Sequence, residues 1–149
     1  MFRATVNTPS LPLQSIAAFS IPSYLDVVMA RHLAVHKEAK KGDVRGVITY
    51  LHDNPGIDPD VLDSDGKSAL WTACLHGYYR VARVLLRGGA DANLKCGRSN
   101  STPLQAAAST NRWIMLRLLV EAGADLYVRT KEGFSVHHFA VLADSPDAL

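Results

Sequence analysis

The feature that most constrains this chain is a sequence period of 34 residues. Positions between residues 63 and 94 recur at that offset, so that Leu70 matches Leu104 and Gly89 matches Gly123. Identity at a constant offset is typical of repeat architectures, in which one short supersecondary unit is copied and stacked. We therefore expect a solenoid of similar units.

Short motifs also recur with this period. The segments GKSALWTA, STPLQAAA and GFSVHHFA place Ser68, Thr102 and Ser135 at equivalent positions, and RGGADAN and EAGADLY follow the first two. In these motifs the chain resembles the ankyrin-repeat family. The resemblance implies an all-α solenoid of stacked helix-turn-helix units within a domain from residue 23 to residue 149. We expect three full repeats and a partial fourth, over residues 33–62, 63–96, 97–129 and 130–149.

Capping signals predict the helix boundaries. Ser23, three residues before Asp26, resembles an N-cap, and the helix after it is expected to continue to about Lys41 and Gly42. This helix leads into an atypical first repeat that lacks the Thr-Pro signature. Residues that recur along it at three- and four-residue steps predict one apolar face, made of Leu25, Val28, Met29, His32, Leu33 and His36.

The second and third repeats carry clearer signals. Ser68 and Thr102 are expected as N-caps, with Pro103 at the first helical position, where its missing amide donor costs nothing. Gly89 and Gly123 are expected to close the second helices in the left-handed conformation.

The tryptophans and cysteines are interpreted first as structural residues. Trp71 and Trp113 are expected to pack, and Cys74 to be a small buried side chain. Cys96 lies in a polar connection and is expected to be a free thiol. Two such cysteines make neither a disulfide framework nor a metal site, which favours a reducing compartment. We expect a cytoplasmic protein, with the nucleus as the alternative.

Composition and motifs narrow the function classes. A net charge of +2 gives no reason to expect a nucleic-acid partner. The apolar runs are far shorter than the ~20 residues that span a bilayer, so no membrane insertion is expected. The sequence has no nucleophile elbow and no phosphate-binding loop. We therefore expect no catalytic residues and no cofactor.

The two ends differ from the repeats. Residues 1–22 hold three prolines and a single charge, Arg3, and are expected to form an extended or disordered leader. Their apolar segments are too interrupted for a secretory signal, and an organelle transit peptide is the alternative. The fourth repeat reaches Leu149 before a second helix can be completed. Either a short product or the amino-terminal part of a longer protein is expected, and the second is preferred.

Histidine spacing raises the question of a metal site. His32 and His36 are four residues apart, and His137 adjoins His138, but no nearby cysteine or carboxylate completes a set of ligands. No metal is expected. His138 aligns with the histidine of the family's Thr-Pro-Leu-His motif, and the resemblance implies a structural hydrogen bond for it.

The resemblance also implies a protein-binding surface. In the ankyrin family the partner usually lies along a concave side formed by the turn tips and the exposed edge of the first helices. We expect a monomer that binds a protein partner there, with Leu75 and Phe134 as energetic anchors because large side chains dominate binding. The aligned positions are Lys40, Lys41, Ser64, Asp65, Lys67, Leu75, His76, Arg98, Ser99, Ser101, Ser109, Thr110, Lys131, Glu132 and Phe134.

One position is a candidate for modification. Leu85, Asp91 and Asn93 have the spacing of the site that asparaginyl hydroxylases modify in ankyrin domains, which the sequence resembles here. The third repeat departs from it, with Tyr127 in place of the asparagine. The alternative for Asn93 is a residue that shapes a turn.

The sequence therefore predicts a non-catalytic protein-interaction module, such as an adaptor or scaffold. One alternative is an ankyrin-type inhibitor of an enzyme such as a cyclin-dependent kinase. In those inhibitors the first helix of the second repeat is shortened, whereas SALWTACLHG has full length. The other alternative is a targeting module of a larger enzyme or effector.

Overall fold

The computed structural model describes residues 23–144, so the expected leader and the last residues of the fourth repeat lie outside the described residues. Within this range every regular element is a helix, and β-type pairing is confined to two isolated bridges, Leu62 with Ser68 and Cys96 with Ser101. The helices are α2 (Tyr24–Lys41), α3 (Val44–Asp53), α4 (Ala69–His76), α5 (Tyr79–Arg87), α6 (Pro103–Ser109), α7 (Trp113–Glu121) and α8 (Val136–Asp144). The predicted all-α solenoid is confirmed.

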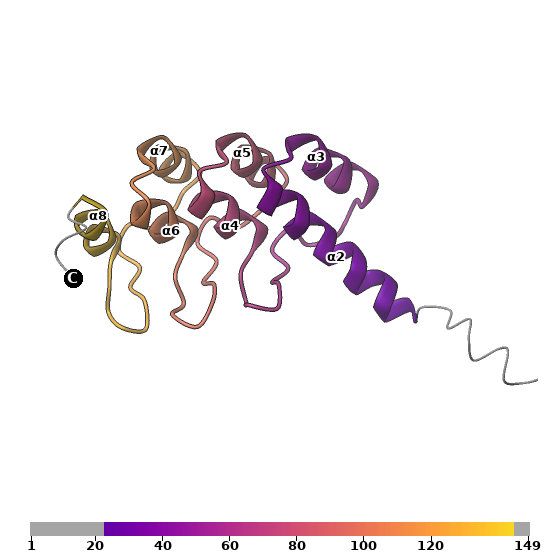
Figure 1. Ribbon diagram of the computed structural model, residues 1–149, viewed down its shortest axis with the longest axis horizontal. Coiled ribbons are helices and arrows are strands. Elements are labelled where there is room, and N and C mark those ends of the chain that lie inside the picture. The colour runs from indigo at the N-terminus through magenta and orange to yellow at the C-terminus, as the bar shows by residue number, and fades with distance from the viewer. Residues whose placement is uncertain (1–22, 145–149) are drawn as a thin grey trace, which may run out of the picture.

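The helices lie in two rows. Figure 1 shows α2, α4, α6 and α8 side by side in one row and α3, α5 and α7 in the other, with long turns extending away from the first row. Each helix of the first row packs on the next one along the chain, and each of α2, α4 and α6 also packs on its own hairpin partner. This is the stacked arrangement in which a repeat buries its apolar side against a neighbour.

Side-chain caps begin the first helices as predicted. The Ser23 hydroxyl accepts a hydrogen bond from the Asp26 amide, and Asp26 accepts one from the Ser23 amide in return. Ser68 caps α4, and Thr102 caps α6 with Pro103 at the first position of the helix. These caps satisfy amide donors that the helix cannot bond internally.

Left-handed residues close the helices. Gly89 and Gly123 have φ of 93° and 87°, as expected for glycines that end the second helices. Gly77 closes α4 with φ of 77°, and the equivalent position after α6 holds Asn111, with φ of 52°. Asparagine is one of the few residues other than glycine that enter this region at little cost.

Small and large apolar residues share the core. Leu70, Leu85, Leu104 and Leu119 are at most 1% exposed. Alanines line the contact between α4 and α6, where their small size lets the helices approach closely, and Cys74 is buried beside them as predicted. The core therefore runs continuously from one repeat to the next.

The free thiol expected at Cys96 is confirmed, and it is buried within its connection: Cys96 is 1% exposed, with its Sγ 3.5 Å from the Ser68 Oγ, because its backbone pairs with Ser101 and turns the side chain inward. One sequence interpretation is wrong. Trp113 is not a packing residue, since 67% of it is exposed. It stands at the first position of α7, and helical side chains lean toward the N-terminus, so no turn of α7 covers it.

The apolar face expected on the first helix is only partly buried. His36 is buried, but Leu25 and Met29 are 71% and 58% exposed and Leu33 is also exposed. The reason is length: α2 has 18 residues and its neighbour α4 has 8, so α2 extends about 15 Å beyond the stack. Figure 1 shows this half of α2 leading away from the other helices.

Side chains also join successive connections at the base of the second helices. Asp60 accepts hydrogen bonds from the Asp91 amide at 3.0 Å, and Asn93 accepts one from the Asp125 amide at 2.7 Å. The Asn93 amide group also donates to the Gly123 carbonyl at 3.1 Å. We call Asp60 and Asn93 the Asx ladder, because each ties its own connection to the following one.

Candidate protein-binding surface

The turns between repeats form one edge of the molecule, here called the turn-tip edge and made of residues 63–67, 96–101 and 130–134. Each turn is closed by its own backbone: the Asp63 amide donates to the Lys67 carbonyl, Cys96 exchanges two hydrogen bonds with Ser101, and the Thr130 amide donates to the Phe134 carbonyl. A closed turn presents its tip residues in a fixed geometry.

Neighbouring tips are also bonded to one another. The Gly97 amide donates to the Gly66 carbonyl at 2.7 Å, and the Lys131 amide donates to the Ser99 carbonyl at 3.0 Å. These bonds between tips use backbone groups and therefore occupy none of the tip side chains. The turn-tip edge is thus a preformed surface that loses little conformational entropy on binding.

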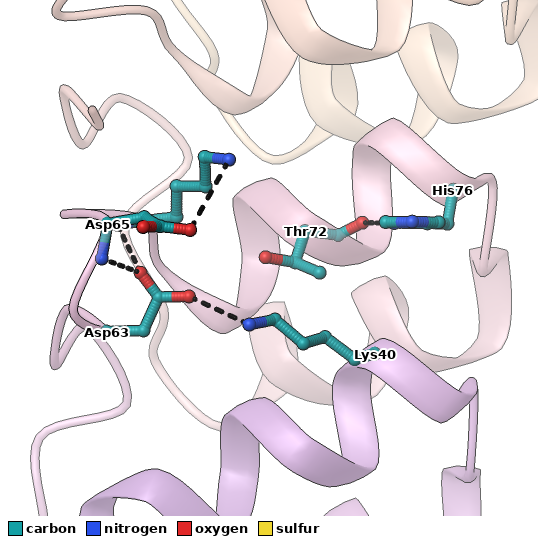
Figure 2. A network of polar contacts seen from close by, with 6 residues as sticks. Lys40, Asp63, Asp65, Thr72 and His76 are labelled. Carbon is teal, nitrogen blue, oxygen red and sulfur yellow. Dashed lines mark hydrogen bonds and ion pairs between the residues drawn. The ribbon is translucent and has the colours of Figure 1, made fainter. Parts of the chain in front are cut away.

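Asp63 anchors the first of these turns, as Figure 2 shows. One carboxylate oxygen accepts hydrogen bonds from the Asp65 and Lys67 amides at 3.0 Å, and the other lies 3.2 Å from the Lys40 ammonium group on α2. Burial raises the pKa of Asp63, but these hydrogen bonds and Lys40 outweigh it and hold the pKa below its usual value. Lys40, a predicted binding residue, therefore also joins the first repeat to the second.

The first two tips bring four predicted residues together. A cleft of about 580 Å³ is lined by Ser64, Asp65, Lys67 and Arg98 together with Gly66 and Gly97. The Lys67 ammonium group lies 5.0 Å from the centre of the Trp71 ring and 3.9 Å from the Asp65 carboxylate. Trp71 packs against the core and donates from its indole nitrogen to the Ser101 hydroxyl at 2.9 Å, as expected for a packing residue.

The third tip contributes an aromatic and a charged pair. Phe134 is 42% exposed and makes edge contacts with the rings of His138 and Phe139. Lys131 and Glu132 are exposed beside it. Hydrogen bonds from its own amide and from the hydroxyls of Thr130 and Ser99 lower the pKa of Glu132, so this carboxylate is charged at neutral pH.

The remaining predicted residues lie at the other end of the first helices. Figure 2 shows His76 at the opposite end of α4 from Asp65. The His76 ring stacks on Tyr78 and its Nδ1 lies 2.9 Å from the Thr72 carbonyl, while Leu75 is half-buried against the core. Leu75 therefore has less side chain to offer a partner than Phe134.

Three exposed polar residues close the ends of these helices. The Ser109 and Thr110 hydroxyls donate to carbonyls of the last turn of α6, and Lys41 pairs with Glu38 at 3.6 Å. The predicted set is therefore divided into the turn-tip edge and a second group at the C-terminal ends of α2, α4 and α6. Of these two groups, the turn-tip edge is the one that combines a cleft, an exposed phenyl ring and cationic side chains at successive tips.

Asn93, the candidate modification site, is already engaged through the Asx ladder. Its side chain bonds to Asp125 and Gly123 in the next connection, as a turn-shaping residue would. Its hydroxylation stays a prediction, which peptide mass spectrometry tests through a gain of one oxygen at Asn93.

The histidines do not gather into a ligand set. His138 accepts a hydrogen bond from the Ser135 amide and lies 2.8 Å from the Ser135 hydroxyl, so the expected structural role of His138 is confirmed. Between residues 23 and 144, no cluster of three or more histidines, cysteines or acidic residues has the arrangement of a metal site. In the same range, no helix has both the length and the apolar character needed to cross a bilayer.

Comparison with known proteins gives relatives of varied organisation. The chain is 36% identical over 110 residues to the inactive serine/threonine-protein kinase TEX14 of Mus musculus. The aligned segment makes up 73% of this chain and 7% of the relative. It is 37% identical over 92 residues to a putative ankyrin repeat-containing protein of Treponema pallidum, and this segment makes up 61% of this chain and 30% of the relative. It is 25% identical over 122 residues, or 80% of the chain, to palmitoyltransferase AKR1 of Kluyveromyces lactis, of which it spans 16%.

These relatives share a short segment rather than a whole protein, since the chain spans less than a third of each of them. The family model described as ankyrin repeats in three copies matches residues 32–130, which is most of the chain and includes α3 to α7 in full. Stacked helical hairpins, linked turn tips and this match lead to one conclusion. The chain belongs to the ankyrin-repeat family.

Proposed function

We propose that this chain is a non-catalytic interaction module that binds a protein partner with its turn-tip edge. Ankyrin repeats are protein-interaction modules in general. The observation that carries the proposal is the direct bonding between adjacent tips, Gly66 to Gly97 and Ser99 to Lys131. It holds the cleft around Lys67 and Arg98 and the exposed Phe134 ring in one rigid surface.

The composition of this surface indicates the kind of partner. Lys67, Arg98 and Lys131 supply cations at successive tips, and Phe134 supplies an exposed ring at the end. A partner that places carboxylates along the tips and an apolar side chain at Phe134 would complement both features. We expect Phe134 to contribute more than Leu75, because Leu75 is already half-buried.

Affinity capture from a lysate of the source organism, followed by measurement of the isolated pair, tests this proposal. The paired substitutions Arg98→Glu and Phe134→Ala are expected to weaken binding at least about tenfold. The matched control is Arg45→Glu with Tyr127→Ala, which makes the same change of charge and also removes an exposed aromatic ring, but outside the turn-tip edge. Binding that survives the first pair and fails with the control would contradict the proposal.

An enzyme inhibitor of the ankyrin type is a weaker candidate. Such inhibitors have a shortened first helix in the second repeat, whereas α4 has 8 residues and the equivalent α6 has 7. The full-length α4 therefore favours the general interaction module. A kinase assay with purified protein tests the candidate directly, and dose-dependent inhibition would favour it.

A module of a larger protein is the second candidate, and the comparisons supply its support. In the mouse and bovine relatives named inactive serine/threonine-protein kinase TEX14, the similar segment is 7% of the whole protein. Under this proposal the repeats would bind a partner for a longer chain. Sequencing the source transcript for an in-frame extension tests it.

A further inference from the structure

A second surface lies on the row of second helices, away from the turn-tip edge. A cleft of about 590 Å³ lies between the start of α7 and the loop before α5 and is lined by Tyr79, Trp113 and Ile114, among others. A smaller cleft of about 310 Å³ continues from the same three residues along α7 to Leu118 and Glu121. We call the two together the second-helix groove.

The groove exposes apolar side chains that are not buried in the core. Trp113 and Ile114 are adjacent and are 67% and 50% exposed, and Tyr79 faces them across the groove. Single exposed apolar residues are ordinary, but a contiguous set of them in a cleft is typical of an interaction site. Trp113 differs in this from Trp71, whose indole nitrogen is bonded and whose ring packs on the core.

Basic residues outnumber acidic ones around the groove. The sequence of α5 and α7 with the residue before α7 contains five arginines, of which Arg83 lies over the Tyr79 ring and Arg112 lines the groove. The only acid in these helices is Glu121, which is bonded to Arg117 at 2.9 Å. Five arginines and one glutamate give these segments a net charge of +4, whereas the chain as a whole carries a net charge of only +2.

We propose that the second-helix groove binds an acidic segment of a partner protein, which inserts an aromatic or large aliphatic side chain between Tyr79 and Trp113. Carboxylates that flank this side chain would then lie against Arg83 and Arg112. This site goes beyond the proposed function, because it shares no residue with the turn-tip edge. It would allow one chain to hold two partners at once.

The shape and lining of the groove favour a protein segment over other anionic partners. Met115 and Ile114 give the cleft an aliphatic lining that suits an inserted side chain. Glu121 at the far end opposes a uniformly charged polyanion such as a phosphate backbone. A recessed apolar lining also suits a projecting side chain better than a flat lipid surface.

Synthetic peptides of defined charge test this site directly. The probes are fluorescein-labelled peptides in which tryptophan, phenylalanine or leucine is flanked by glutamate and aspartate, with lysine versions as controls. Fluorescence anisotropy is expected to show binding of the acidic peptides alone. Trp113→Ala is expected to weaken binding at least about tenfold, while the thermal midpoint stays close to that of the wild type because the ring is exposed.

Two charge-reversal variants test whether peptide binding depends on the arginines of the groove. Arg83→Glu with Arg112→Glu is expected to abolish most of the binding. Lys37→Glu with Lys95→Glu makes the same change of net charge at exposed positions outside both surfaces and is expected to leave binding unchanged. Equal loss in both pairs would show unspecific attraction and overturn the site.

Two further results would overturn the proposal. One is the absence of binding by every acidic peptide. The other is stronger binding, dependent on Arg83 and Arg112, to phosphatidylserine vesicles or to a single-stranded oligonucleotide, which would assign the groove to a lipid surface or a nucleic acid. Neither result affects the turn-tip edge, which these variants do not change.

Discussion

The interior repeats and the terminal repeats are built from the same motif but are buried to different extents. In the second and third repeats, Leu85 and Leu119 are fully buried. In the first helix, Leu25 and Met29 are mostly exposed, and in the fourth repeat Val141 is 65% exposed. The motif alone therefore does not determine burial. Packing against neighbouring repeats within the described residues does, as expected when stability is divided between units and the interfaces that join them.

The largest effect is expected from the interior leucines. Leu85→Ala and Leu119→Ala each leave a cavity in a fully buried site and are expected to lower the free energy of unfolding by about 2 to 5 kcal/mol. Leu25→Ala removes a side chain that is already in water and is expected to change it by less than about 0.5 kcal/mol. Urea denaturation of the three variants measures the contrast. Similar midpoints would break the distinction between interior and end.

The junction between the first two repeats is the next test. Asp63→Asn keeps the shape of the side chain but removes the charge that pairs with Lys40, and we expect a loss of about 1 to 3 kcal/mol. Because the pKa of Asp63 is lowered in the folded state, its contribution is present above the unfolded pKa, about 4, and is lost as the pH falls through the folded value. Acid titration of stability in wild type and variant is the measurement. Equal acid sensitivity would contradict this role for Asp63.

The Asx ladder is expected to have a smaller effect. Asn93→Ala removes two hydrogen bonds to the next connection and is expected to cost about 1 kcal/mol, whereas Asn93→Asp keeps the acceptor, as Asp60 does in the preceding connection. Tyr127→Ala is the control at the equivalent exposed position. Thermal unfolding of the three variants gives the order, and a loss for Tyr127→Ala as large as for Asn93→Ala would count against the ladder.

The smallest effect is a pH dependence at the inner end of α2. Burial lowers the pKa of His36 from 6.5, against the opposing attraction of the Asp63 carboxylate. The unfolded chain therefore binds a proton more readily, and stability is expected to fall as the pH drops below about 6.5. His36→Gln is expected to flatten this part of the profile, by less than about 1 kcal/mol. A profile that keeps its slope in the variant would assign the effect to another group.

Local signals in the sequence predicted the local parts of the structure. The caps at Ser23, Ser68 and Thr102, the left-handed glycines and the bond of His138 each depend on residues within a few positions of one another. The period then placed equivalent helices beside one another. These are the features that a motif encodes completely.

Contacts between distant residues were not predictable in this way. The pairing of Lys40 with Asp63 and the bonding of Asn93 to Asp125 join different repeats, so the spacing of residues within one motif does not predict these contacts. The exposure of Trp113 depends on its place at the start of α7, which aromatic character alone does not reveal. The sequence predicts that the turn tips form a surface. It does not predict the hydrogen bonds between one tip and the next, because these bonds join different repeats.

The Asx ladder also bears on how such a chain could grow. Each rung is a single side chain that receives an amide from the unit after it, so a duplicated unit ending in aspartate or asparagine brings its own connector. A copy inserted after the second repeat would meet Asn93 and be tied in at once. A copy inserted after the third repeat would meet Tyr127, which has no carboxylate or amide oxygen to accept that hydrogen bond. The contact between these two repeats would then depend on core packing alone.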